Sequence, residues 1–347
     1  MKTTPASLLI KHLRESVLNV DSTWSVERSG GFSWWPHQQR QDIFVDRQRT
    51  EDDGTVLERV VVSTEIGTLA KEDYARHESV SELTAISTLS GMVCEGRALR
   101  LHAHAWVEKS NQALYDMVLG LVAGLQIHEA ALIAGVLNKA RLCQPAITPH
   151  PVNGLRDEPD EIASVVQTLI APTGRQATPW PADLFESLRK NYLGGPPCLL
   201  ASGGPTGITA EFPFGTESSL LQANTDQTHP VVGKGLWVLN SFKCDELSED
   251  SYPNPLILNA WEIEHANQPF FGSWSEPKNA CLTFVTFVPN VISQSAAATN
   301  FILLGVGRAR FVSIQRLGDD WSTTWDEEGN CKAKTAVERA VRKNPKS

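Results

Sequence analysis

The pair His102 and His104 is the part of the sequence that most resembles a reactive site. Residues at i and i+2 of a strand point to the same side, so on a strand expected at 97–108 the two imidazoles could begin a metal site. Such a site needs further His and Asp ligands at successive strand ends. The preceding hundred residues show no strand–helix alternation that would supply them. We therefore interpret the pair as histidines facing solvent or a partly polar helix surface, and expect no metal and no other cofactor.

A second candidate for chemistry is Glu262 with His265, on a helix expected at 254–267. A carboxylate and an imidazole there could do acid–base work if a cleft brought a nucleophile near them. The sequence lacks a Gly-x-Ser-x-Gly nucleophile elbow, and the glycine-rich turn at 203–207 lacks the Lys-Ser or Lys-Thr of a phosphate-binding loop. Six widely spaced cysteines without a C-x-x-C pair indicate free, buried thiols. No catalytic residue is assigned.

Composition excludes several classes of protein. The chain has 347 residues, of which 41% are hydrophobic and 20% charged, which suits two globular domains. Its net charge of −9 disfavours a nucleic-acid partner. The N-terminal residues 1–20 read as an amphipathic helix, not a signal peptide. The most apolar stretch, 114–137, is interrupted by polar residues and glycines and reads as a buried helix. We expect a cytoplasmic protein that does not associate with a membrane.

Hydrophobic periodicity and turn residues predict similar element orders in the two halves of the chain. In the first half we expect helices at 5–19, 79–92 and 110–137 and strands at 42–47, 59–67 and 97–108, with turns at Gly30-Gly31 and Asp52-Asp53-Gly54 and a capping box of Ser79 with Glu82. In the second half we expect helices at 162–170, 182–192, 254–267 and 293–317 and strands at 198–201, 206–214, 219–223, 236–242 and 280–288.

The two halves share one specific pattern. The strand at 99–104 followed by a helix at 112–125 matches the strand at 282–287 followed by a helix at 296–306. This predicts an internal duplication and an α+β fold of two tandem modules, each an antiparallel sheet flanked by helices. The modules are expected at 1–140 and 161–318, joined by a proline-rich linker at 141–160 and followed by a polar, basic tail at 319–347.

Several stretches of the second half carry a family resemblance: 210–214 (AEFPF), 229–236 (HPVVGKGL), 258–262 (LNAWE) and 272–274 (GSW). They resemble the type III secretion chaperone-like fold, including the YbjN-like family. The resemblance is in sequence motifs over about 205–310 and in element order over most of the chain. The resemblance implies a compact antiparallel sheet flanked by helices that dimerises and holds an extended stretch of a client protein. A tandem copy could supply that pairing within one chain. This chain differs from the small acidic chaperones in its length and its ten tryptophans.

Large aromatic residues near turns are the expected contact residues, because rigid rings give much contact area at small entropic cost. The candidates are Trp34, Trp35, Pro36, Phe212, Phe214, Phe270, Phe271 and Trp274. The leading hypothesis is a non-enzymatic protein-binding chaperone or adaptor, monomeric or homodimeric, that captures a partner segment through a sheet edge or a helix-flanked groove. Two alternatives stay open. One is an enzyme with an inter-module site using His102/His104 or Glu262/His265, and the other is a structural subunit of a larger bacterial assembly.

Overall fold

The computed structural model divides the chain into two compact units, each described below by itself. Unit 1 comprises Met1–Arg175 and Pro253–Glu276, and unit 2 comprises Gln176–Tyr252 and Pro277–Ser347. The structure describes residues 4–170, 180–193, 200–214, 217–243, 254–265, 267–278, 281–290 and 295–317. The predicted tail at 319–347 lies outside these residues.

Unit 1 is built on an antiparallel sheet. Its strands are β1 (Ser25–Arg28), β2 (Gly31–Trp34), β3 (Gln41–Thr50), β4 (Val56–Leu69), β5 (Gly91–Glu95), β6 (Ala98–Val107) and β7 (Cys143–Pro145). They follow the order β1-β2-β3-β4-β6-β5, with β7 paired to one end of β4. The predicted turn between β3 and β4 is confirmed: Gly54 takes a φ of +84°, and the Thr55 amide donates to the Asp53 carboxylate at 2.8 Å.

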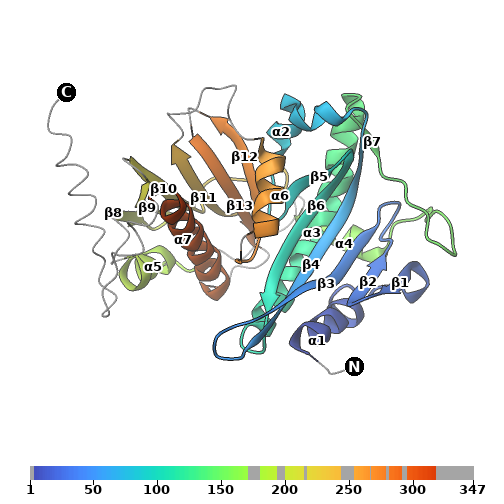
Figure 1. Ribbon diagram of the computed structural model, residues 1–347, viewed down its shortest axis with the longest axis horizontal. Coiled ribbons are helices and arrows are strands. Elements are labelled where there is room, and N and C mark those ends of the chain that lie inside the picture. The colour runs from blue at the N-terminus through green and yellow to red at the C-terminus, as the bar shows by residue number, and fades with distance from the viewer. Residues whose placement is uncertain are drawn as a thin grey trace. The chain divides into compact units, whose positions relative to one another are not determined.

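Helices pack on the sheet of unit 1. Unit 1 contains α1 (Pro5–His12), which a π-helical turn (Leu13–Val17) continues, and α2 (Glu78–Thr84), α3 (Gln112–Lys139), α4 (Glu161–Ile170) and α6 (Pro255–His265). The long helix α3 lies along β4 and β6 (Figure 1). Alternate strand residues such as Ile66 and Leu101 are fully buried in one core with Ile133 and Leu137 of α3. By strand alternation, the intervening residues face away from α3.

A buried polar network also ties α3 to the sheet. The Gln41 Nε2 group donates to Thr64 Oγ1 at 2.8 Å and to the Ala123 carbonyl at 2.9 Å. Thr64 Oγ1 in turn donates to Gln126 Oε1 at 2.8 Å, and the Gln126 amide donates to Ser90 Oγ at 2.9 Å. Each of these polar groups is satisfied, so the network fixes the position of α3 without leaving a buried donor unpaired.

Unit 2 is built on a second antiparallel sheet. Its strands are β8 (Leu200–Gly204), β9 (Gly207–Phe214), β10 (Glu217–Asn224), β11 (Gly235–Lys243), β12 (Ser273–Lys278) and β13 (Cys281–Pro289), in the order β12-β13-β11-β10-β9-β8. Helix α5 (Leu184–Tyr192) packs on β8 and β9, and α7 (Ser295–Leu317) packs across β9, β10 and β11. The division between the units falls within β12.

The two sheets have the same connectivity. The strands of unit 2 lie in the order β8-β9-β10-β11-β13-β12, and those of unit 1 in the order β1-β2-β3-β4-β6-β5. If β8 to β13 are matched one by one with β1 to β6, the two orders are identical. In both, a helix separates the fourth and fifth strands, and a long helix follows the sixth. The expected α+β fold of two antiparallel sheets is confirmed. The strand–helix pairs that suggested duplication occupy equivalent places, as β6 with α3 and β13 with α7.

The boundaries predicted from the sequence need correction. Residues 141–160 are not a free linker, because β7 pairs with β4 and the Asp160 amide donates to the Pro36 carbonyl at 2.6 Å. Helix α4 and residues 253–276 belong to unit 1, not to the second unit. The linker prediction was wrong because prolines at this density still leave enough backbone amides to pair with a neighbouring strand. The predicted cap of α2 is also wrong: His77, not Ser79, caps the helix.

A His-Pro-Val-x-Gly turn occurs once in each unit, at 150–154 and 229–233. In both, the histidine Nδ1 accepts hydrogen bonds from the backbone amides two and three residues later, at distances of 3.1–3.3 Å. The histidine and glycine backbones also exchange two hydrogen bonds. His150 contacts Trp24 and Trp35, whereas His229 contacts Trp237 and Phe287. The two turns lie at different places in the shared topology, so each is a local solution to a tight turn.

Among the described helices, α3 is long and apolar enough to span a membrane. Most of its apolar stretch is buried against the sheet of unit 1, as expected for a core helix.

Candidate functional site

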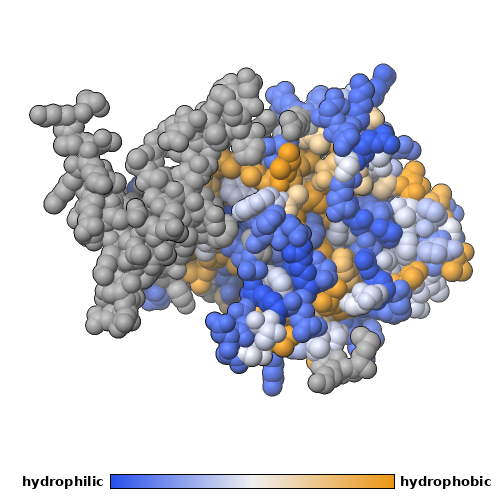
Figure 2. All heavy atoms as spheres, viewed as in Figure 1, coloured by the Kyte–Doolittle hydropathy of each residue, from blue (hydrophilic) through white to orange (hydrophobic). Residues whose placement is uncertain are grey.

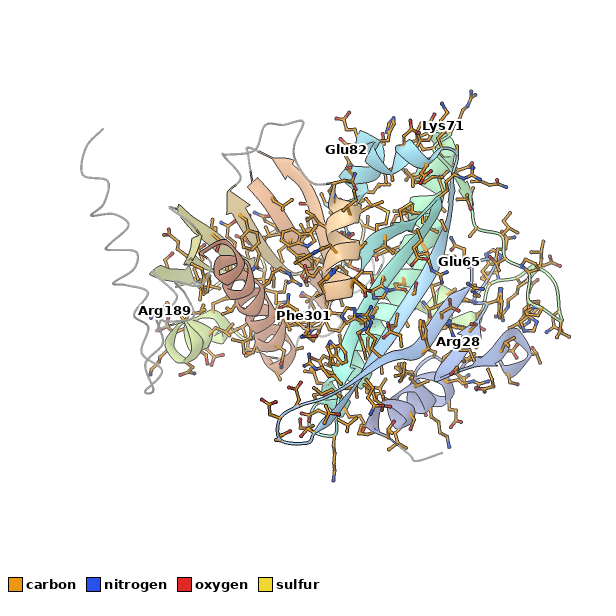
Figure 3. All side chains as sticks on the ribbon, viewed as in Figure 1. Arg28, Glu65, Lys71, Glu82, Arg189 and Phe301 are labelled. Carbon is orange, nitrogen blue, oxygen red and sulfur yellow. The ribbon has the colours of Figure 1, made fainter. Side chains whose placement is uncertain are left out.

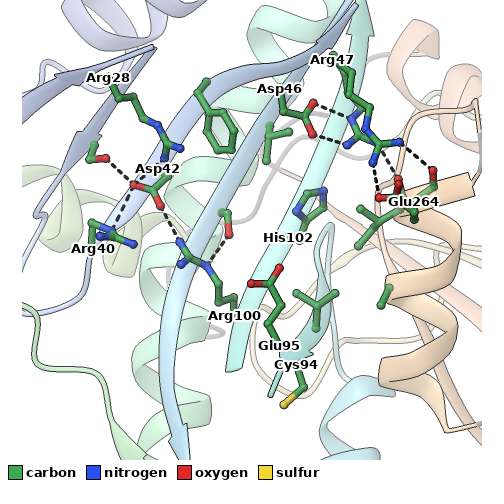
Figure 4. A pocket seen from close by; sticks show the side chains of 18 residues that line it. Arg28, Arg40, Asp42, Asp46, Arg47, Cys94, Glu95, Arg100, His102 and Glu264 are labelled. Atoms are coloured by element: carbon green, nitrogen blue, oxygen red, sulfur yellow. Dashed lines mark hydrogen bonds and ion pairs between the residues drawn. The ribbon is translucent and has the colours of Figure 1, made fainter. Parts of the chain in front are cut away.

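The sheet of unit 1 carries a groove of about 760 Å³ on the face that points away from α3. Its floor is formed by alternate residues of β3, β4 and β6, with Ser33 of β2 and residues 93–95 of β5. Ala260, Ile263 and Glu264 of α6 form one wall (Figure 4). We call it the sheet groove. Five arginines and four carboxylates line it: Arg28, Arg40, Arg47, Arg59 and Arg100 with Asp42, Asp46, Glu95 and Glu264. A fifth carboxylate, Glu65, pairs with Arg40 and Arg100 of this lining, so the five arginines are matched by five carboxylates in all.

Three arginines of the β3–β4 hairpin hold the carboxyl end of α6 against the sheet. Arg59 Nη1 donates to the Ile263 carbonyl at 2.6 Å, Arg47 Nη1 to the Glu264 carbonyl at 2.9 Å, and Arg49 Nη1 to the Asn267 carbonyl at 3.0 Å. The last carbonyls of a helix lack intrahelical partners and carry partial negative charge, so cationic donors stabilise them. Arg59, whose side chain is 3% exposed, also pairs with both oxygens of Asp46. This face of the hairpin is mostly hydrophilic in Figure 2.

Asn259 fastens the middle of α6 to the edge strand β5. Its Nδ2 donates to the Met92 carbonyl at 2.8 Å and to Ser273 Oγ at 2.9 Å, while its Oδ1 accepts from the Trp274 amide at 2.8 Å. Asn259 is fully buried. Together with the three arginines, it makes the helical wall of the groove a fixed part of unit 1.

At the other end of the groove, Arg28, Arg40 and Arg100 converge on Asp42. Their nearest nitrogens lie 3.2, 3.3 and 2.6 Å from its oxygens, and Ser33 Oγ donates to Asp42 at 2.6 Å. Arg40 and Arg100 also share Glu65, at 2.9 and 3.6 Å. Arg28 and Glu65 are labelled in Figure 3. We call Arg28, Arg40 and Arg100 the arginine cluster.

His102 and His104 form a hydrogen-bonded chain beside the groove. His104 Nε2 lies 3.2 Å from the Gln268 carbonyl, which only accepts, so this nitrogen carries the proton. His104 Nδ1 then accepts from His102 Nε2 at 3.1 Å. By the same reasoning His102 Nδ1, on the ring that lines the groove, is an unprotonated acceptor.

Both imidazoles are held neutral. Burial, helped by the nearby charge of Arg59, lowers the pKa of His102 to about 3. Burial and the adjoining His102 hold the pKa of His104 well below its ordinary value. Burial also raises the pKa of the Cys94 thiol, with Glu72 and Glu95 adding to the effect. The groove thus presents a fixed hydrogen-bond acceptor and a protonated thiol at neutral pH, instead of a proton shuttle or a thiolate.

The sequence correctly placed both histidines on one side of a strand, where their rings are hydrogen-bonded, but their surroundings differ. His104 is fully buried against residues 268–270, where its backbone exchanges two hydrogen bonds with Phe270. His102 lines the groove. Among the described residues, no group of three or more His, Cys, Asp and Glu side chains is placed to hold a metal ion.

The residues chosen as partner contacts are core residues where the structure describes them. Trp34, Trp35, Pro36, Phe212, Phe270, Phe271 and Trp274 are all buried, and the side chain of Phe214 lies outside the described residues. Trp34 donates to Gln41 at 2.9 Å and Trp274 to Glu262 at 2.8 Å. The physical reason is that these side chains found apolar neighbours in the core, so proximity to a turn did not bring exposure. The indole of Trp35 is buried even though its Nε1 has no hydrogen-bond partner among the described residues.

The second candidate pair, Glu262 and His265, does not meet. Glu262 is buried and accepts from Gln268 and from Trp274. His265 is exposed, lies within hydrogen-bonding distance of the Trp261 carbonyl at 2.9 Å and stacks on the Trp261 ring. The two side chains, three residues apart on α6, therefore contact different neighbours and do not form an acid–base pair.

Sequence reasoning missed every arginine of the groove. A usable signal was present: Asp42, Phe44 and Asp46 alternate with Ile43 and Val45, and Arg59, Val61 and Ser63 alternate with Val60 and Val62. Such period-two alternation of charged and apolar residues marks a sheet with one polar face. Its pairing across β3, β4 and β6 brings Asp42, Ser63 and His102 into one row.

Comparisons with protein-family models, with curated proteins and with solved structures found no significant match to this chain.

Proposed function

We propose that this chain is a non-enzymatic binding protein that captures an extended segment of a partner protein in the sheet groove. The observation that carries the proposal is the groove itself: an open, charged channel on a sheet face, with a helical wall that three arginines and Asn259 fix in place. A preorganised surface binds without the entropic cost of ordering its own side chains.

The chemistry of the lining supports binding in preference to catalysis. Small-molecule sites are mostly apolar with a few polar groups, whereas charged side chains dominate here. His102 is too weak a base near neutral pH, and Cys94 holds its proton. The resemblance of the sequence to secretion chaperone-like proteins points in the same direction, because that fold is associated with holding extended client segments.

The proposal is tested by selecting phage-displayed peptides on the immobilised protein. Ala260 is exposed on α6 and lines the groove, so Ala260→Trp places an indole in the channel without removing a buried contact. Ala131→Trp, at an exposed position of α3 outside the groove, is the matched control. We expect selected peptides to bind the wild type and the control equally and to lose at least tenfold in affinity for Ala260→Trp. Peptides that bind all three proteins alike would contradict the proposal.

A further inference from the structure

The arginine cluster carries more positive charge than its own carboxylates neutralise. Three guanidinium groups face Asp42 and Glu65, which leaves one positive charge in excess at this end of the groove. Asp42 is nearly saturated, because it contacts all three arginines and accepts from Ser33. The excess charge therefore faces the groove instead of a partner within the protein.

Arg28 supplies donors for a ligand. Its Nη1 lies 3.2 Å from Asp42 as an ion pair, yet among the described residues Arg28 makes no hydrogen bond. Its guanidinium carbon lies 3.8 Å from the centre of the Phe44 ring. A guanidinium stacked on an aromatic face keeps its N–H edge free for two parallel hydrogen bonds to a carboxylate. Arg40 adds charge to the cluster and no free donor, because its Nε lies 3.3 Å from Asp42 and its Nη2 lies 2.9 Å from Glu65.

At the opposite end of the groove, the arginines already have partners within the protein. Arg47 and Arg59 already bond to carbonyls of α6 and to Glu264 and Asp46. Asp42 and Asp46 are four residues apart on β3, so the two ends are separated by about 13 Å. That distance is the span of about four residues of extended polypeptide. Between the two ends, the groove offers the partly exposed ring of Phe44 and the acceptor of His102.

From this geometry, and resting on the function proposed above, we propose that the arginine cluster is an anion subsite that takes the carboxylate of an acidic side chain in the captured segment. Recognition of acidic motifs by clustered arginines is an established mode of peptide binding. The remainder of the segment extends past Phe44 toward His102, whose unprotonated Nδ1 accepts a backbone or side-chain N–H. Because the subsite is partly exposed, its contribution falls as salt rises.

The subsite is tested with blocked amino acids instead of a partner. N-acetylglutamate methylamide is titrated into the full-length protein while the arginine Nε–Hε signals are followed by NMR, with N-acetylglutamine methylamide as the uncharged equivalent and inorganic phosphate as a third probe. The test variant is Arg28→Gln, at a partly exposed position, and Arg97→Gln, at an exposed arginine outside the groove, is its control. Arg28→Lys, which keeps the charge but loses the planar fork, guards against a fold defect in Arg28→Gln.

We expect the glutamate probe to shift the signals of the arginine cluster and the glutamine probe not to bind. The affinity for the glutamate probe should fall at least tenfold in Arg28→Gln, fall by an intermediate amount in Arg28→Lys and stay unchanged in Arg97→Gln. Equal binding of the two blocked amino acids, or an unchanged affinity in Arg28→Gln, overturns the subsite. Phosphate binding more than tenfold tighter than glutamate overturns the assignment to an acidic side chain.

The two proposals fail in distinguishable ways. If the glutamate probe binds the cluster but no displayed peptide depends on Ala260, the subsite stands and peptide capture does not. If displayed peptides depend on Ala260 but show no enrichment of Asp or Glu and bind Arg28→Gln normally, peptide capture stands and the acidic subsite does not.

Discussion

At the scale of single residues, Glu129 is an ionisable group poorly matched to its buried surroundings. It lies on α3 with 5% of its surface exposed, and among the described residues neither carboxylate oxygen has a hydrogen-bond partner of acceptable geometry. Burial raises its pKa to about 7, an effect that the neighbouring Thr88 only partly offsets. An unpaired carboxylate in a protein interior favours its protonated form.

Glu129 should make unit 1 less stable at alkaline pH. Its pKa in the fold lies above the unfolded value of 4.5, so stability falls as pH rises from about 4.5 to about 7 and then levels off. Glu129→Gln removes this penalty. We expect it to raise the free energy of unfolding by on the order of 3 kcal/mol at pH 8 and by under about 1 kcal/mol at pH 5. Urea unfolding at both pH values checks this, with the exposed Glu161→Gln as control. A gain of equal size at both would contradict it.

The His102–His104 chain has the opposite pH dependence. Its folded pKa values lie below the ordinary value of 6.5, so the stability it contributes is complete above that pH and is lost as pH falls toward about 3. Nitrogen NMR of the imidazoles should show both rings neutral at pH 5.5, each protonated on Nε2. Imidazolium signals from either ring in folded protein at that pH would refute both the tautomer assignment and the neutral acceptor in the groove.

At the scale of secondary-structure elements, α6 depends on Asn259. Replacing this residue with alanine leaves the Met92 carbonyl and the Trp274 amide without their partners in a buried setting. We expect Asn259→Ala to destabilise unit 1 by about 2–4 kcal/mol, because each orphaned backbone group bears its full desolvation cost. Asn138→Ala, at an exposed position of α3, should change stability by less than about 0.5 kcal/mol. Chemical denaturation of both variants tests this, and similar losses in the two would count against the role of Asn259.

The same elements show what sequence reasoning reaches and where it stops. Periodicity and turn residues located β3, β4, β6, α3, α6 and β13 to within a few residues, because local patterns determine them. The docking of α6 is non-local: Asn259 bonds to a carbonyl 167 residues earlier, and Arg59 to one 204 residues later. A hydrogen bond between such distant groups leaves no trace in local pattern. The groove was therefore out of reach, although the charge alternation of its floor was visible.

At the scale of the whole molecule, the shared topology and the division into units do not coincide. By connectivity α6 is the counterpart of α2, since each follows the fourth strand of its sheet. Nevertheless α6 belongs to unit 1, where it packs on β5 and contributes Leu256 to the core. The helix that follows the fourth strand of the second sheet thus packs in unit 1, so neither half of the sequence contains all the elements of one unit. This is why a boundary placed in the proline-rich stretch fails.

This interdependence predicts that residues 1–175 alone form an incomplete unit. Without 253–276, the core loses Leu256, the Met92 carbonyl is orphaned, and His104 loses both backbone hydrogen bonds to Phe270. Joining 253–276 to residues 1–175 through a glycine–serine linker should restore the unit and raise its stability by several kcal/mol. Hydrogen exchange at the His104 amide is the site-specific measure: it should be fast in the short chain and slow in the joined one. The amide of Val62, on a strand whose partners β3 and β6 both lie within 1–175, reports on the remaining sheet. Equal protection of His104 in the two chains would show that α6 is an accessory and that the groove needs no helical wall.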